Sequence, residues 1–537
     1  MTHSNIEDYL KENQKLMEEL NRANLEKEKL DNEIARLKHE NNELNQKIEF
    51  ILEQLRLGKS KTFGRSSDTS VCEQLSFPIF NEAEMEYDSN TSEEKETIVY
   101  TRNKKKKGHR EEMFENLPVE TIEYVLPEEE QFCDKCNCKL HVMSKETRRE
   151  VVIIPAKVKL KEHVRYIYSC RCCEKKDTEA TIKKASMPNP ALPNSFASAS
   201  AIAYVMCEKF VKGLPLYRQE QDWARLGFKI SRQTMSNWMV LSSDRWLKPL
   251  YERMREYLIQ RDILHVDETT LQVLQEPGRP ASTKSYMWLY RTGREGPHIV
   301  LFNYQMTRAG KHPREFLDGY KGYLSTDGYS GYNDMPGIIN VGCLAHAQRM
   351  FTNVIKAMPP NNDSKSSLAE EGLRFFTQLF AIEKAIEELS NEERYRIRQE
   401  KSRPIIEEFK KWINYHYPRV LPKSTLGKAI AYCKNQMPKL EGFLLDGRLE
   451  MTNNRAERSI RPFTIGRKNW IFSNTPSGAN SSAIIYSMVE TAKENDLNPY
   501  LYLEYLFDKL PNVDLGDKEM LDEFLPWSDN LPEFLKA

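Results

Sequence analysis

Three acidic residues, far apart along the chain, have surroundings that suit metal-assisted chemistry. Glu457 lies among arginines and a lysine in residues 452–470, Asp267 interrupts an apolar stretch, and Asp327 ends another. Carboxylate oxygens are the ligands that Mg²⁺ prefers, and basic side chains beside them can neutralise phosphates. The three residues therefore suggest chemistry on a polyphosphate chain.

Each acid also has an ordinary structural interpretation. Glu457 could be residue N3 of a capping-box-like turn with Asn454 as the N-cap. The dipeptide that begins at Asp327 is a common turn, and Asp267 could bind a backbone amide. The elements around these residues must decide between the two interpretations.

The order of the predicted elements favours the interpretation of these acids as metal ligands. The pattern predicts strands at residues 262–273, 285–291, 298–304, 322–327 and 337–346, with a helix near 313–317 and another after the last strand. Three strands, a crossover helix, a fourth strand and a further strand–helix step is the order of a ribonuclease-H-like sheet. Asp267 and Asp327 would then lie on adjacent strands and could share a cation. An unpaired acid in mid-strand is unfavourable, which also indicates a cation.

Several motifs together identify a resemblance. They are the exit of the N-terminal helix at residues 63–67, the paired CxxC module, and residues 265–269, 325–329, 343–349, 453–462 and 466–470. Over nearly its full length the chain resembles transposases of the insertion sequence 66 family, of the TnpC type. The resemblance implies a DDE triad of Asp267, Asp327 and Glu457.

The resemblance also implies the reaction. Two Mg²⁺ or Mn²⁺ ions, about 3.5 to 4 Å apart, would activate a water and then a 3′ hydroxyl for in-line attack on a phosphodiester. The element's ends would be cleaved and the freed 3′ end joined to target DNA. His346 and Arg349 follow the fifth strand; His346 could orient the scissile phosphate or be an ordinary core histidine. Four further residues are expected to contact phosphates: Arg458, Arg461, Arg467 and Lys468.

The first 57 residues predict a parallel coiled coil. Apolar residues recur every seven positions from Tyr9 to Ile51, and a second set falls four positions after each from Leu16 onward. Asn41 and Lys27 in this second set favour two strands, because a buried Asn pairs best with its symmetry mate. We expect a homodimer or higher oligomer; one amphipathic helix packed on its own domain is the alternative.

Two CxxC pairs predict a structural zinc site. Cys133 and Cys136 form one pair and Cys170 and Cys173 the other, with strand-like residues between them. Four thiolates on two turns can close a tetrahedral Zn²⁺ site in a ribbon-like module. Cys172 could replace Cys173, and a buried thiol cluster without metal is the alternative.

Residues 217–240 predict two helices joined at Gly227, with Ser231 as the cap of the second helix. Arg232, Gln233 and Asn237 would face outward at its start, where they could reach base edges or phosphates in a major groove. A plain helical hairpin is the alternative.

The sequence thus predicts a multidomain α+β protein. Its expected parts are a coiled coil (1–57), a flexible linker (58–110), a zinc-binding module (111–182), a helical DNA-binding region (185–258), a ribonuclease-H-like core (262–357 and 448–492) interrupted by a helical insertion (358–447), and a helical tail (493–537). Lys plus Arg and Asp plus Glu each number 79, so DNA affinity must come from local patches. No apolar run is long enough for a membrane, and we expect a cytoplasmic, nucleoid-associated protein.

The expected partners are double-stranded DNA, at the element ends and at the target, and small accessory proteins of the same element. Two other functions are compatible with the same residues: a catalytically silent DNA-binding dimer that acts as a regulator or accessory protein, and a ribonuclease-H-like nuclease that cuts but does not join.

Overall fold

The computed structural model describes residues 157–169, 182–358 and 367–536, and five helical residues near the N-terminus: Met17, Lys27, Lys29, Glu33 and Arg36. The chain divides into two units, residues 1–65 with 158–537 and residues 66–157. The predicted linker and the cysteines at 133, 136, 170, 172 and 173 lie outside the described residues, as does nearly all of the predicted coiled coil.

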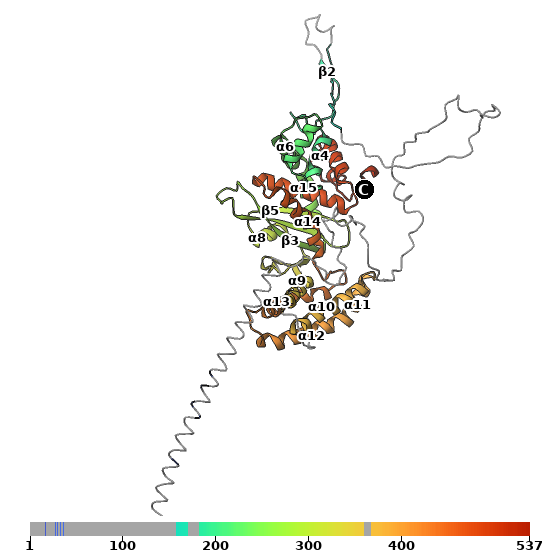
Figure 1. The fold of residues 1–537 in the computed structure, drawn as a ribbon. Coiled ribbons are helices and arrows are strands. Elements are labelled where there is room, and N and C mark those ends of the chain that lie inside the picture. The colour runs from blue at the N-terminus through green and yellow to red at the C-terminus, as the bar shows by residue number, and fades with distance from the viewer. Residues whose placement is uncertain are drawn as a thin grey trace, which may run out of the picture. The chain divides into compact units, whose positions relative to one another are not determined.

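The first described elements are a short hairpin and a group of helices (Figure 1). The hairpin pairs β1 (Ile167–Ser169) with β2 (Ile182–Lys184) in antiparallel orientation. The helices are α4 (Ala199–Phe210), α5 (Leu216–Arg225), α6 (Arg232–Ser242) and α7 (Lys248–Leu258).

A five-stranded mixed sheet follows, in the order β5-β4-β3-β6-β7. Its strands are β3 (Ile263–Gln272), β4 (Lys284–Thr292), β5 (Val300–Gln305), β6 (Gly322–Thr326) and β7 (Ile338–Gly342), with α8 (Lys311–Phe316) between β5 and β6. The first three strands are antiparallel, and β6 pairs parallel with β3 and with β7. All five predicted strands and the crossover helix are present in the predicted order.

The edge strand β5 is covered by α15 (Pro476–Glu494). An edge strand leaves backbone groups without strand partners, and these must bond elsewhere when they are buried. The Ser487 hydroxyl accepts from the Phe302 amide at 2.8 Å, and the Thr491 hydroxyl accepts from the Val300 amide at 3.0 Å. The two helix hydroxyls therefore replace a neighbouring strand.

The predicted helix pair before the sheet is confirmed. Gly227, with φ +87°, joins α5 to α6, and the Ser231 hydroxyl accepts from the Thr234 amide at the start of α6. Glycine adopts a positive φ more easily than other residues do. Gly227 in the sequence therefore predicted the position of this turn.

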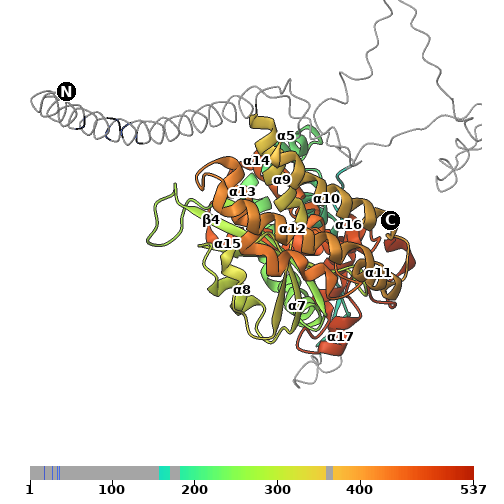
Figure 2. The same cartoon turned by 90° about the horizontal axis from the view of Figure 1, so that it is seen from below.

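The remaining elements are helical. They are α9 (Leu344–Ala357), α10 (Leu368–Ala385), α11 (Asn391–Ile397), α12 (Arg403–His416), α13 (Thr425–Leu440), α14 (Asn454–Trp470), α15, α16 (Pro499–Lys509) and α17 (Lys518–Asp522). Figures 1 and 2 show α9 to α13 gathered together, on the side of the sheet away from α4 and α6. The apolar faces of α9, α10, α12 and α13 form a core of their own, separate from the core of the sheet.

One boundary differs from the prediction. The fifth strand was expected over 337–346, but β7 ends at Gly342 and Cys343 is the N-cap of α9. A Cβ atom at Gly342 would lie 3.1 Å from the backbone nitrogen of Leu440, so α13 passes too close for a side chain. His346 consequently lies in the first turn of a helix. Among the described residues, no helix has the length and apolar character needed to cross a membrane.

Candidate functional site

The two faces of β3 carry different chemistry. Side chains alternate along a strand, so His265, Asp267 and Thr269 share one face. His265 Nδ1 lies 3.1 Å from the side-chain oxygen of Asn453, the N-cap of α14, and Thr269 accepts from Arg467 of α14 at 3.2 Å. Asp267 lies between these two contacts on the strand and therefore faces α14.

The Asp267 carboxylate has no ion-pair partner among the described residues. One oxygen accepts from the Glu268 amide at 2.8 Å, which confirms the predicted backbone bond and leaves the other oxygen without a hydrogen bond in this part of the chain. Burial, then the charges of Glu268 and Asp327, and to a smaller extent that of Glu457, together raise the pKa of Asp267 to about 8. The acid thus sits in a cluster of negative charge.

Asp327 directly follows β6, the parallel neighbour of β3. The last pair in the register is His265 with Ser325, so Asp267 and Asp327 each lie two residues beyond it. The predicted turn is present: one Asp327 oxygen accepts from the Tyr329 amide at 3.0 Å, and Gly328 has φ +94°. The turn uses one carboxylate oxygen and leaves the second.

Glu457 lies in the first turn of α14, but the predicted capping box does not form. The N-cap is Asn453, not Asn454, and its side chain bonds no amide of the helix. Instead, Asn453 Nδ2 donates to the Val266 carbonyl oxygen at 2.7 Å. The cap residue therefore ties α14 to β3, one residue before Asp267, and Glu457 remains available for another role.

His346 and Arg349 both lie beside Glu457. His346 Nε2 is 3.5 Å from Glu457 Oε1, and Arg349 Nη2 is 4.0 Å from Glu457 Oε2. His346 is not a satisfied core histidine: its side chain is 27% exposed and its Nδ1 atom is buried without a hydrogen-bond partner among the described residues. The structure thus brings both predicted supporting residues to the third acid.

The basic residues of α14 divide into two groups. Arg458, Arg461 and Lys468 are exposed and have no hydrogen bond or ion pair within the described segments. Arg467 is half-buried and donates to the hydroxyls of Thr269 and Thr270, and burial lowers its pKa. Three cations are therefore free to meet an external anion, whereas Arg467 already bonds β3.

At the start of α6, Arg232, Gln233 and Asn237 are exposed, as predicted. The Gln233 amide donates to the Asn237 side-chain oxygen at 3.0 Å, and the Arg232 guanidinium lies 5.9 Å from the centre of the Tyr217 ring. The side chains form a polar strip on one helix face.

The sequence analysis missed a buried ion network beside the site. Glu450 accepts from Arg294 at 2.7 Å and from Arg455 at 2.6 Å. Burial opposes its ionisation, but the charges of His265 and Arg455 and the two arginine hydrogen bonds lower its pKa to about 2. Arg455, counted among the basic residues around Glu457, therefore serves a different acid. No local pattern could have shown this, because Arg294 is far away in the sequence.

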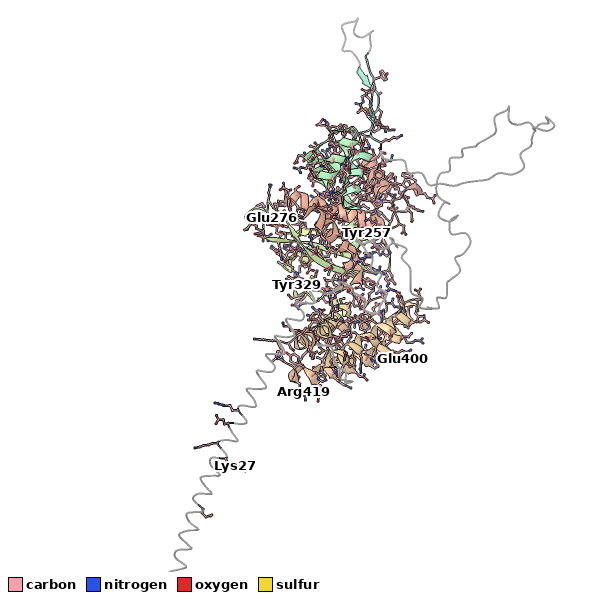
Figure 3. All side chains as sticks on the ribbon, in the orientation of Figure 1. Lys27, Tyr257, Glu276, Tyr329, Glu400 and Arg419 are labelled. Carbon is pink, nitrogen blue, oxygen red and sulfur yellow. The ribbon has the colours of Figure 1, made fainter. Side chains whose placement is uncertain are left out.

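Glu268, on the opposite face of β3, was also missed. Its buried carboxylate accepts from Arg308 Nε at 2.7 Å and from the Tyr332 hydroxyl. Burial raises its pKa, while the Tyr332 and Arg308 hydrogen bonds lower it. Arg308 also lies 4.0 Å from the centre of the Tyr329 ring, which is labelled in Figure 3. Glu268 is thus a paired acid, in contrast to its neighbour Asp267.

The mixed sheet brings a cluster of acids beside exposed cations, an arrangement that suits phosphate-containing polymers, and the comparisons give the family. The model described as "Transposase IS66 family" matches residues 194–481, more than half of the chain. The chain belongs to this family of transposases, and membership implies DNA as its partner.

Three further models of the same family match other parts of the chain. They are the IS66 C-terminal element (487–527), the zinc-finger binding domain of transposase IS66 (130–174), and "Transposase C of IS166 homeodomain" (51–122). The zinc-finger match contains all four cysteines predicted to bind Zn²⁺ and supports zinc as a ligand of this chain. The 51–122 match covers the segment expected to be a linker.

Curated relatives come from Sinorhizobium fredii. The chain is 28% identical to the uncharacterized protein y4hP over 73% of each chain. It is also 28% identical to the uncharacterized protein y4jD, over 75% of this chain and 79% of the relative.

Proposed function

We propose that this protein is a DDE-type transposase that cleaves DNA at the ends of its element and joins the 3′ ends to target DNA. The observation that carries the proposal is the convergence of Asp267, Asp327 and Glu457 from three elements, with no ion pair to Asp267 or Asp327 among the described residues. The strand order and directions support a ribonuclease-H-like core, in which acids in these positions hold metal ions.

The donor set fits divalent metal ions. Asp267 and Asp327 each use one oxygen in a backbone hydrogen bond and keep the other, and Glu457 Oε1 is buried without a hydrogen bond among the described residues. Hard carboxylate oxygens suit Mg²⁺ or Mn²⁺. Bound there, two ions would supply Lewis-acid stabilisation of the attacking and leaving oxygens.

The protein's own residues would position the DNA. Arg458 and Arg461 project from the same helix as Glu457 and can hold phosphates beside it, as can Lys468. His346, 3.5 Å from Glu457, can donate to a phosphate oxygen or orient the carboxylate. Asn453 keeps the first turn of α14 against β3, so Glu457 and Asp267 hold a fixed separation.

The other segments would support DNA binding and assembly. We propose that Arg232, Gln233 and Asn237 of α6 read DNA, that the segment with Cys133, Cys136, Cys170 and Cys173 holds Zn²⁺, and that residues 1–57 join the chains in a parallel coiled coil. We also propose that α10 to α13 form an insertion in the catalytic core, because they lie between β7 and α14 in sequence and build a separate apolar core.

The test is a cleavage and joining assay with purified full-length protein, DNA that carries the element ends, and Mg²⁺ or Mn²⁺. Asp267→Asn, Asp327→Asn and Glu457→Gln should each abolish both products and leave DNA binding unchanged in a gel-shift assay. Glu400→Gln is the matched control, because Glu400 is exposed on the segment between α11 and α12 (Figure 3). Strand joining by the Glu457→Gln protein would contradict the assignment of the third acid.

The same assay distinguishes the other functions. Cleavage without joined products would identify a nuclease. DNA binding without cleavage, in the presence of any accessory proteins encoded beside this gene, would identify a regulator.

A further inference from the structure

A second set of possible metal ligands lies on the other side of Glu457. Cys343, His346 and Glu457 each offer one ligand atom, and these three atoms lie within 4.8 Å of one another. The set combines a thiol, an imidazole and a carboxylate, whereas the Asp267 side of Glu457 offers oxygens only. It is therefore chemically different from the carboxylate site.

The fold holds these side chains in place from two directions. Cys343 is the N-cap of α9, and His346 lies in the first turn of the same helix. The Leu344 amide donates to the Met451 carbonyl at 2.9 Å, and the Asn453 amide donates to Cys343 Sγ at 3.3 Å. These bonds join the start of α9 to the chain that leads into α14, so the ligand atoms converge without any bound ion.

Two buried polar atoms of these residues have no hydrogen-bond partner in the described part of the chain. Glu457 Oε1 and His346 Nδ1 are buried and make no hydrogen bond within the described residues. A buried polar atom without a hydrogen bond is unfavourable, and most such atoms in proteins bond a residue, a water or an ion. The Glu457 and His346 side chains are 28% and 27% exposed, which leaves an ion a route from solvent.

The distances suit a small tetrahedral ion. Bonds from Zn²⁺ to sulfur, nitrogen and oxygen of about 2.0–2.3 Å place tetrahedral ligands about 3.3–3.8 Å apart. His346 Nε2 and Glu457 Oε1 already lie 3.5 Å apart. Side-chain rotation would bring a third ligand atom, now within 4.8 Å, to the same separation.

We propose that Cys343, His346 and Glu457 form a binding site for a cation of the Zn²⁺ or Co²⁺ type. Thiolate and imidazole ligands select such ions over Mg²⁺, which prefers oxygen. The consequence rests on the proposed function: because Glu457 also serves the carboxylate site, Zn²⁺ bound to this Cys–His–Glu site withdraws Glu457 from the Mg²⁺-dependent reaction. The site makes Zn²⁺ an antagonist of cleavage.

Cobalt binding tests the site without relying on activity. Full-length protein with its zinc module loaded is titrated with Co²⁺, and the bound ions are counted by equilibrium dialysis while thiolate-to-cobalt absorption is recorded. The wild type should bind one more Co²⁺ than Cys343→Ser, with loss of the extra thiolate absorption in the variant. Cys207→Ser, another buried thiol, is the matched control and should bind as the wild type does. Equal binding by wild type and folded Cys343→Ser would overturn the proposal.

A second variant avoids the buried position. Cys343 is 1% exposed, so a substitution there can disturb folding, whereas His346 is partly exposed. His346→Gln should weaken Co²⁺ binding by at least about 10- to 100-fold, the effect of losing even an outer hydrogen-bond partner of a metal ligand. Unchanged Co²⁺ affinity in His346→Gln would overturn the proposal.

Asp267→Asn separates this site from the proposed function. That variant should lose cleavage and keep the extra Co²⁺, because Asp267 is not a ligand of the Cys–His–Glu site. Loss of the extra Co²⁺ in Asp267→Asn would place the ion at the carboxylates and contradict the proposal. In the wild type, Zn²⁺ should inhibit Mg²⁺-dependent cleavage, and His346→Gln should need at least tenfold more Zn²⁺ for the same fractional inhibition. Equal Zn²⁺ sensitivity in the two proteins would contradict the antagonism.

Discussion

Two regions beside each other treat buried acids in opposite ways. Glu450 is held by Arg294 and Arg455, and its pKa is lowered to about 2. Asp267, on the strand that α14 crosses, has other acids as neighbours and a pKa raised to about 8. The first acid has its counter-charge within the chain, and the second has no ion-pair partner among the described residues.

The cations show the same division. Arg455 and the buried Arg398 are used inside the protein, the latter by Glu383 and by carbonyls of residues 443–449. Arg458 and Arg461 have no acid partner in the described part of the chain. The paired charges hold the fold, whereas Arg458 and Arg461 lie exposed in the first half of α14, the helix that carries Glu457. The contrast between paired and unpaired charges therefore locates the candidate site better than any single residue does.

The largest expected effect comes from removing an unpaired acid. Asp267→Asn should lower the cleavage rate by about a thousandfold or more, equivalent to at least about 4 kcal/mol in activation free energy. It should not lower the free energy of unfolding, because it removes an acid whose charged form has no ion-pair partner among the described residues. Single-turnover cleavage and urea unfolding in Mg²⁺-free buffer measure the two quantities. A large loss of stability would mean that Asp267 is a structural acid like Glu450.

The opposite result is expected for a paired charge. Arg398 is fully buried, and it donates to Glu383 and to the carbonyls of Phe443, Asp446 and Leu449. Arg398→Met should lower the free energy of unfolding by about 3–5 kcal/mol, since it leaves several buried carbonyls without their donor and leaves Glu383 with Arg394 alone.

Urea unfolding of Arg398→Met is compared with Arg403→Met, which removes an exposed arginine five residues along the chain. The control should change the free energy of unfolding by no more than about 0.5 kcal/mol. Similar values for the two variants would show that the Arg398 network contributes little.

The sequence predicts the positions of the unpaired acids better than the partners of the paired ones. Apolar strands reveal Asp267 and Asp327, because an acid in or directly after such a strand is conspicuous and the strand order places the two acids side by side. The sequence does not reveal the pairing of Glu450 with Arg294, because the two residues are more than 150 positions apart and meet only in the folded chain. Asn453 was missed for a related reason: its side chain bonds β3 rather than its own helix, so local capping rules selected the wrong asparagine.

The pH dependence should separate the two acids. A carboxyl group whose pKa is raised from its ordinary value of 3.8 to about 8 keeps its proton in the folded state, so unfolding releases a proton between these pH values. Asp267 should therefore make Mg²⁺-free protein less stable as the pH rises from about 4 to 8, by at most about 1.4 kcal/mol per pH unit. Glu450 contributes the reverse: its stabilisation is present above pH 4.5 and is lost as the pH falls towards 2.

Urea unfolding at pH 5, 6.5 and 8 checks this expectation by difference. The stability of the wild type minus that of Asp267→Asn should fall with rising pH. A constant difference across this range would show that Asp267 is ionised in the folded protein and is neutralised by a group of the chain.

The smallest expected effects belong to the unpaired cations. Arg458→Ala and Arg461→Ala should each weaken DNA binding, and each should reduce the slope of log affinity against log salt by about 0.9, the contribution of one phosphate contact. Fluorescence anisotropy with end-containing DNA over a salt series measures both. Arg419→Ala is the control, because this exposed arginine stacks on Tyr415 at 3.8 Å in the helical segment, where no DNA contact is proposed (Figure 3). If Arg458→Ala and Arg419→Ala show the same slope of log affinity against log salt, Arg458 makes no phosphate contact. The exposed cations of α14 would then be a solvated helix face, and only the acids would identify the site.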